Sequence, residues 1–169
     1  PVNHTRPVDA ARLLDIPYLC LHTPADNMVS SFLQALFERE LPPRLKDVVK
    51  LLKQIPEYQE AARNNAGPRI LIGSDAQRTG KVFVDMTGGT SGSKDTLEKL
   101  SQSGVGTIVG MHMSEDHRKE AEKHHIHVVI AGHISSDTLG LNLLLDSVEK
   151  RWPFQVLDCS GFKRIKRPG

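Results

Sequence analysis

The chain has 169 residues, of which 38% are hydrophobic and 25% are charged, a balance typical of a globular protein with one ordinary domain or two small ones. Its formal net charge is only +2, and Lys and Arg gather only in a short run at 162–167, so the chain carries no strong signal for nucleic-acid binding. Two distant cysteines argue against a disulfide framework or a Cys-based zinc module and favour a cytoplasmic location, and no apolar stretch has the length of a membrane span.

The first part of the chain is predicted to form a helix, a short strand and a longer helix. Residues 8–14 have the pattern of a helix end, and the apolar residues 16–21 predict a buried strand. Residues 28–39 predict a helix because apolar side chains recur at helical spacing, at positions 28, 29, 32, 33, 36 and 37.

A further helix is predicted after two prolines, which end the preceding one. Its apolar side chains recur at helical spacing between residues 45 and 55. Residues 56–68 then end in a loop rich in Asn and Gly. This loop is the best candidate for a boundary within the chain.

From residue 69 onward, predicted strands alternate with predicted helices. Two β-branched runs, 69–73 and 81–86, are separated by a polar turn and predict a hairpin. Beyond them we expect a helix at 94–101, a strand at 105–110, a helix at 114–124, a strand at 126–131, a helix at 137–150 and a strand at 154–157. The alternation predicts an α/β fold, with helices on the faces of a sheet that the hairpin makes mixed.

A repeated His-x-x-x-Asp spacing is the strongest functional signal. His22 and Asp26 follow the first predicted strand, and His133 and Asp137 follow the strand at 126–131. Strand ends are where ligands bind in α/β proteins, and imidazole with carboxylate suits Zn, Fe or Mn. The alternative is a helix cap, in which each Asp accepts hydrogen bonds from free backbone N–H groups. The duplication favours the metal hypothesis over either pair taken alone.

A glycine-rich loop joins the strand at 81–86 to the next helix. Gly88, Gly89 and Gly92 are candidates for binding a phosphate, because backbone amides at a helix amino end attract anions. The loop matches neither the P-loop nor the dinucleotide fingerprint. The alternative is a tight turn in which Ser93 caps the helix.

A further polar segment, residues 110–117, follows the strand at 105–110. Ser114 is expected to cap the next helix. His112 and His117 lie in the same crevice as His133 if the strands at 105–110 and 126–131 are neighbours. We take His117, Glu115 and His22 as candidates for carrying protons or orienting ligands, although each has a structural alternative.

Three segments resemble, in order and spacing, the second half of the Nif-three-like family, the NGG-one-interacting-factor group. They are residues 15–27 (DIPYLCLHTPADN), 85–92 (DMTGGTSG) and 130–137 (IAGHISSD). The resemblance covers about residues 5–145. Some members of this family carry the label GTP cyclohydrolase type 2. The resemblance implies the family's α/β fold and a centre with two divalent metal ions.

The resemblance implies that Asp26, His133 and Asp137 are metal ligands. Family members also use an upstream His-His pair, and a Glu at the position of Asp137. In this chain no His-His pair precedes Asp26, and the adjacent His124 and His125 lie on the wrong side of the motif order. We therefore expect a carboxyl-terminal piece whose upstream half supplies that pair, and poor binding of Zn, Fe or Mn without it.

Two classes of function follow from the resemblance. One is a metal-dependent hydrolase, in which paired ions activate a water and orient a nucleotide-like or other phosphorylated substrate. The alternative is a metal-binding regulatory or assembly protein without turnover. In both, residues 1–40 and 126–169 are predicted to be parts of the metal-binding α/β domain, and residues 41–125 an inserted second lobe.

The resemblance also implies a homo-oligomer. The helix at 28–37 is the expected contact surface, because its apolar stripe is wide enough to be buried along its length. The alternative is that Phe32, Leu33 and Phe37 are covered by residues 41–55 of the same chain.

Overall fold

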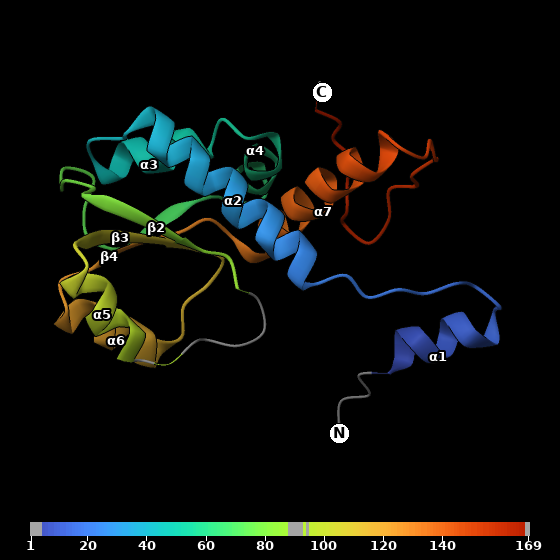
Figure 1. Ribbon diagram of the computed structural model, residues 1–169, viewed down its shortest axis with the longest axis horizontal. Coiled ribbons are helices and arrows are strands. Elements are labelled where there is room, and N and C mark those ends of the chain that lie inside the picture. Colours follow the sequence, from blue (N-terminus) through green and yellow to red (C-terminus); the bar gives the residue numbers. More distant parts are fainter. Residues whose placement is uncertain (1–4, 88–92, 94, 168–169) are drawn as a thin grey trace.

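The fold is an α/β sandwich built on one four-stranded sheet (Figure 1). The computed structural model describes residues 5–87, 93 and 95–167. The strand order is β1-β4-β3-β2, in which β2, β3 and β4 run parallel and β1 is antiparallel to β4. The strands are β1 Arg69–Ile72, β2 Lys81–Asp85, β3 Val105–Gly110 and β4 His127–Ile130. The α/β class with a mixed sheet is confirmed.

The predicted hairpin is wrong, because β1 and β2 lie at opposite edges of the sheet. The two strongly apolar strands β3 and β4 occupy the centre, where both faces are buried, and separate them. The connection between β1 and β2 does not form a tight turn but is hydrogen-bonded to residues 43–45, at the start of α3. There the backbone N–H of Leu45 donates to Gln77 O at 3.1 Å, and that of Thr79 donates to Pro43 O at 3.1 Å.

Helices cover both faces of the sheet (Figure 1). One face carries α2 Thr23–Glu40, α3 Leu45–Leu52, α4 Pro56–Arg63 and α7 His133–Glu149, and the other carries α5 Asp95–Gln102 and α6 Glu115–Lys123. The larger core lies on the first face, where Leu33 and Phe37 of α2 pack in one cluster with Leu45, Val48 and Leu52. Val29, Leu33 and Phe37 of the α2 stripe are therefore buried within the chain, which favours the alternative that residues 41–55 cover this helix, and an oligomer contact through α2 stays a prediction.

The predicted helix at 45–55 is shorter in the structure, where α3 ends at Leu52 and a second, unpredicted helix, α4, begins at Pro56. Pro56 is the first residue of α4, and Ile55 before it has an extended backbone, with φ −82° and ψ 127°. A residue that precedes proline is pushed out of the helical region by the proline ring, so α3 and α4 cannot form one continuous helix through Ile55. Ile55 is nevertheless buried in the core, as the apolar periodicity of this segment predicts.

The amino-terminal segment projects from the body of the molecule (Figure 1). It consists of α1 Arg6–Leu13 and an irregular stretch at 14–22. The predicted buried strand at 16–21 is wrong, since no strand is assigned there and all six side chains are exposed. A strand requires a paired edge and its apolar side chains a covering layer, and the described part of the chain offers this segment neither.

The end of the chain lies against α7 as an irregular segment. The predicted strand at 154–157 is wrong, because these residues pair with no strand. Charged side chains hold residues 164–167 instead. Arg164 donates to Asp146 Oδ1 at 2.5 Å and to Glu149 Oε2 at 3.0 Å.

Helices α2 and α7 pack side by side, and a glycine permits their close approach. A Cβ atom on Gly140 would lie 2.3 Å from the carbonyl oxygen of Ala25. This contact brings the amino-terminal part of α2, early in the chain, against α7 near its end. The division into a metal-binding domain (residues 1–40 and 126–169) and an inserted lobe (residues 41–125) stays a prediction. In the sheet, β4 from the first of these parts lies between β1 and β3 from the second.

None of the helices in the described ranges combines the length and the apolar character needed to cross a membrane.

Candidate functional site

The two predicted His/Asp pairs lie at the amino ends of α2 and α7. His22 Nδ1 is 2.9 Å from Asp26 Oδ2, and His133 Nε2 is 3.6 Å from Asp137 Oδ2. Asp26 is buried, whereas the other three side chains are about half exposed, at 59% for His22, 47% for His133 and 51% for Asp137. Only the second pair follows a strand.

Helix α7 begins at His133, earlier than the predicted residue 137. Gly132 precedes it with φ +113°, where a Cβ atom would lie 2.7 Å from Ser135 Oγ. Only glycine adopts this backbone at low cost, so the turn out of β4 starts the helix at once. His133 therefore lies on the helix, one turn before Asp137.

The two pairs influence each other electrostatically. Burial raises the pKa of Asp137, the nearby His133 opposes that shift, and the carboxylate of Asp26 adds to it. His22 and His112, like His133, oppose the rise in the pKa of Asp137. These side chains act electrostatically on the carboxyl of Asp137 because they lie close to it, and the packing of α2 against α7 brings them together.

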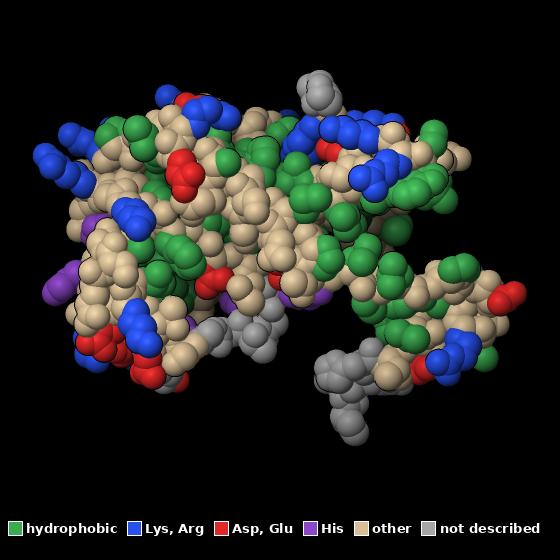
Figure 2. All heavy atoms as spheres, viewed as in Figure 1, with side chains coloured by type: hydrophobic (Ala, Val, Ile, Leu, Met, Phe, Trp, Pro, Cys, Tyr) green, Lys and Arg blue, Asp and Glu red, His purple; other side chains and the backbone are tan. Residues whose placement is uncertain are grey.

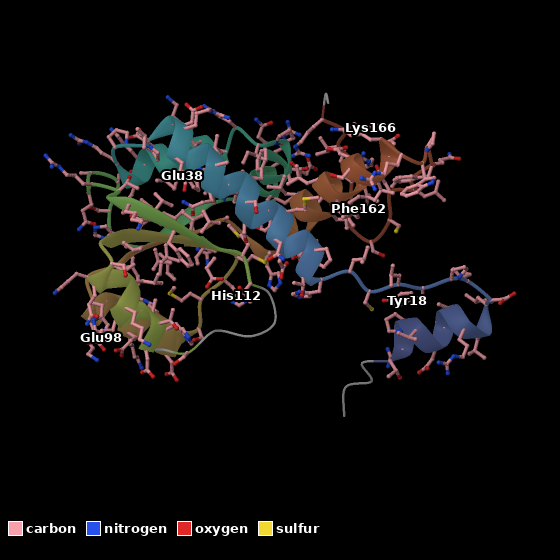
Figure 3. The ribbon with its side chains drawn as sticks, in the orientation of Figure 1. Tyr18, Glu38, Glu98, His112, Phe162 and Lys166 are labelled. Carbon is pink, nitrogen blue, oxygen red and sulfur yellow. The ribbon has the colours of Figure 1, made fainter. Side chains whose placement is uncertain are left out.

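His112 joins this group from the loop after β3. Because β3 and β4 are parallel neighbours, their carboxyl ends meet at one edge of the sheet, and the rings of His112 and His133 lie 4.9 Å apart between centroids. Figure 3 shows His112 at this edge, near the amino end of α2. The predicted meeting of His112 with His133 is confirmed.

The other candidates on α6 make contacts within their own helix. Ser114 caps the helix as predicted, since its Oγ accepts from the backbone N–H of His117 at 3.3 Å. The ring of His117 also bonds Ser114 Oγ, through Nδ1 at 2.8 Å. Glu115 is paired with Arg118 at 3.7 Å. Neither contact connects α6 with the His/Asp pairs, and a catalytic role for either residue stays a prediction.

The predicted phosphate-binding glycines Gly88, Gly89 and Gly92 lie outside the described residues. Ser93, which is described, accepts a hydrogen bond at Oγ from the backbone N–H of Asp95 at 3.3 Å. This contact favours the alternative of a capped helix at the end of the loop.

The side chains of the two His/Asp pairs are of a chemical type that binds metal ions, but too few of them lie together to hold one. Imidazole and carboxylate are suitable ligands for Zn, Fe or Mn. Within residues 5–87, 93 and 95–167, however, no group of three His, Cys, Asp or Glu side chains is placed to hold one ion. These residues therefore present two pairs of donors and not a complete metal centre.

Sequence reasoning missed the buried polar residues beneath this region. Tyr58 of α4 is fully buried, and its hydroxyl lies 2.9 Å from Ser136 Oγ of α7. Burial raises the pKa of Tyr58, so the phenol stays protonated. No local sequence pattern predicts this hydrogen bond, because its two partners come from distant parts of the chain.

A cavity opens beside His112 and His133. Its volume is about 610 Å³. It is lined by α4, β1, the ends of β3 and β4, the start of α7 and residues 161–165. The sequence carried no signal for it, since its walls come from segments up to about a hundred residues apart.

No protein-family profile and no curated protein matches the chain. A solved structure, the NIF3 superfamily protein from Sphaerobacter thermophilus, is similar to it with a TM-score of 0.67 and 26% identity, over 89% of this chain. The chain spans 56% of the length of that protein. Reduced HcgD from Methanocaldococcus jannaschii is more distant, with a TM-score of 0.48 and 14% identity over 65% of this chain and 40% of its own. A Bacillus cereus protein related to NIF3 has a TM-score of 0.43 and 16% identity, over 63% of this chain and 27% of its own. The resemblance to the Nif-three-like family is thus confirmed at the level of the fold, since the chain shares the α/β architecture of the NIF3 superfamily protein that it matches.

Proposed function

We propose that this chain contributes Asp26, His133 and Asp137 to a dinuclear metal centre of a metal-dependent hydrolase. The observation that carries the proposal is the pair of His/Asp contacts at the amino ends of two packed helices. The NIF3-like fold supports it. A nucleotide-like or other phosphorylated molecule is the proposed substrate, and Zn, Fe or Mn the proposed metal.

The remaining candidate residues have supporting roles in this proposal. His22 bonds the carboxylate of Asp26 and would fix its orientation toward an ion. His22, Glu115 and His117 are proposed to hold or transfer protons, and Gly88, Gly89 and Gly92 to bind a phosphate. Ligands beyond the three named residues are required, because two carboxylates and one imidazole leave two ions short of donors.

Metal binding by the 169-residue chain is expected to be weak and to depend on the proposed ligands. Asp26→Asn and His133→Gln each remove a donor, so each is expected to lower the affinity for Zn²⁺ or Mn²⁺ by about tenfold or more. Titration calorimetry with each metal measures this directly. Circular dichroism of the variants checks that the fold is unchanged.

A surface histidine provides the matched control. His125 is exposed and has φ +56°, a conformation that asparagine adopts readily, so His125→Asn is expected to preserve both the fold and the metal affinity. Equal losses of affinity in His125→Asn and His133→Gln would mean that surface imidazoles bind the metal, and would overturn the proposal.

An exposed apolar arm favours the second candidate function, a metal-binding assembly protein without turnover. The arm comprises residues 13–21, and its large apolar side chains are exposed by 87% at Leu13, 69% at Leu14, 55% at Ile16, 51% at Tyr18, 77% at Leu19 and 45% at Leu21. Figure 2 shows apolar side chains along this projecting segment. A continuous apolar surface of this kind typically contacts another protein surface.

Self-association through the arm is expected to disappear when the arm is made polar. Light scattering at low micromolar concentration should give a mass above the 18.7 kDa of one chain. Leu14→Ser/Leu19→Ser should return the mass to that of a monomer, because it removes apolar surface from the contact. The control Leu41→Ser/Leu157→Ser changes equally exposed leucines elsewhere and should leave the mass high. A wild-type mass of one chain would reject assembly by this chain.

We also propose a cytoplasmic location. Cys20 and Cys159 are both unpaired and exposed, which suits a reducing compartment.

A further inference from the structure

The cavity beside His133 has the size and shape of a small-molecule site. Its volume of about 610 Å³ lies within the range of about 300–1,000 Å³ that such sites occupy. It lies at the edge of the sheet, between β1, β4 and α4, with the start of α7 and the tail segment 161–165 completing the wall. Four separate parts of the chain, residues 57–71, 111–113, 130–138 and 161–165, therefore fold together to form it.

The inner wall of the cavity is apolar. Met111 and Ile130 line it with exposures of only 2% and 7%, and Leu71, Met113 and Ala61 extend the same surface. Methionine side chains adapt to the shape of a ring or a branched chain. The cavity therefore suits a molecule with an apolar body.

The charges around the cavity are unbalanced. Both carboxylates in its wall are already paired: Glu57 accepts from Arg167 at 2.6 Å, and Glu60 from Arg63 at 3.0 Å. Two cations in the wall, Arg69 and Lys163, form no ion pair with any residue that the structure describes. The wall thus presents unneutralised positive charge next to apolar surface.

We propose that this cavity binds a small organic anion, with its apolar body against Leu71, Met111 and Ile130 and its acidic group held by Arg69 and Lys163. An arginine matches a carboxylate, sulfonate or phosphate through paired N–H donors, and a lysine adds a point charge. The ligand lies beside the rings of His112 and His133. The proposal does not rest on the metal centre, since no proposed metal ligand holds the anion.

Two fluorescent probes that differ only in their charge test the proposal. Anilinonaphthalene sulfonate is an aromatic anion, and phenylnaphthylamine is the same ring system without the sulfonate. Titrations are made with a chelator present, so that failure of metal binding has no effect on the result. The sulfonate probe should bind at one saturable site, and the uncharged probe about tenfold more weakly, the factor that one charge-assisted hydrogen bond supplies.

Matched variants assign the charge dependence to the cavity. Arg69→Gln/Lys163→Gln should lower the affinity for the sulfonate by about tenfold or more and leave that for the uncharged probe unchanged. Arg39→Gln/Lys50→Gln removes the same charge from exposed positions outside the cavity and should change neither. Equal losses in the two double variants would reveal a general effect of net charge and would overturn the proposal.

Two further variants distinguish binding in the cavity from binding on the exposed apolar arm. Ala61→Phe places a ring in the cavity and should abolish saturable binding, while Leu14→Ser/Leu19→Ser should preserve it. Thermal unfolding establishes that Ala61→Phe remains folded. Should a folded Ala61→Phe bind the sulfonate as the wild type does, the probe binds elsewhere and the proposal is wrong. Loss of binding in the arm variant would have the same meaning.

Discussion

Replacing Gly140 with alanine is expected to destabilise the fold by about 3 kcal/mol, the upper part of the range for overpacking a buried site. The new Cβ would lie 2.3 Å from the carbonyl oxygen of Ala25 and 2.8 Å from its carbonyl carbon. Both atoms belong to the backbone of α2, so no side chain can rotate away, and α2 must move from α7. Urea denaturation followed by circular dichroism measures the loss.

The same substitution also tests how the candidate site is assembled. A displaced α2 carries His22 and Asp26 away from Asp137, and any metal affinity should fall together with stability. Ser147→Ala on the exposed side of α7 is the control, and it should change stability by less than about 0.5 kcal/mol. A stability for Gly140→Ala equal to that of this control would show that the two helices do not cross as described.

Replacing Glu57 with alanine is expected to destabilise the protein by about 3 kcal/mol, because it breaks a buried ion pair and leaves its partner uncompensated. The carboxylate of Glu57 is fully buried and accepts from Asn142 Nδ2 at 2.9 Å and from Arg167 Nη2 at 2.6 Å. It therefore ties α4 to α7 and to the end of the chain.

The tail supplies a second measurement for this variant. Release of Arg167 should raise hydrogen exchange along residues 158–167, and this segment includes part of the cavity wall. Glu60→Ala is the matched control on the same helix, since its ion pair with Arg63 is largely exposed and should contribute about 0.5 kcal/mol. If Glu57→Ala costs no more than Glu60→Ala, the buried pair does not hold the tail.

Local signals predicted most of the helices and the central strands. The apolar run at 105–110 is β3 with the same bounds, and Ser114 caps α6 as its residue type indicated. These features depend on neighbours within a few residues, which is why a single sequence reveals them. The resemblance to the Nif-three-like family rested on three motifs, and the fold agrees with it.

The predictions that depended on strand pairing failed, because a local pattern does not specify the partner of a strand or whether it has one. Residues 69–73 and 81–86 have the composition of a hairpin, but their pairing depends on β3 and β4, which compete for the centre of the sheet. Residues 16–21 are as apolar as a buried strand, yet no paired edge lies beside them in the described part of the chain. Apolar composition therefore predicted a strand where none is paired.

Local sequence patterns were sufficient to predict the α/β class, the central strands, the Ser114 cap and the four residues of the two His/Asp pairs. The complete strand order and the close approach of α2 to α7 at Gly140 emerge only from tertiary packing. It alone assembled the cavity and paired Glu57 with Arg167. The reason is physical: hydrophobic periodicity and capping act within one or two turns, whereas burial, ion pairing and cavity shape depend on segments that the sheet order brings together.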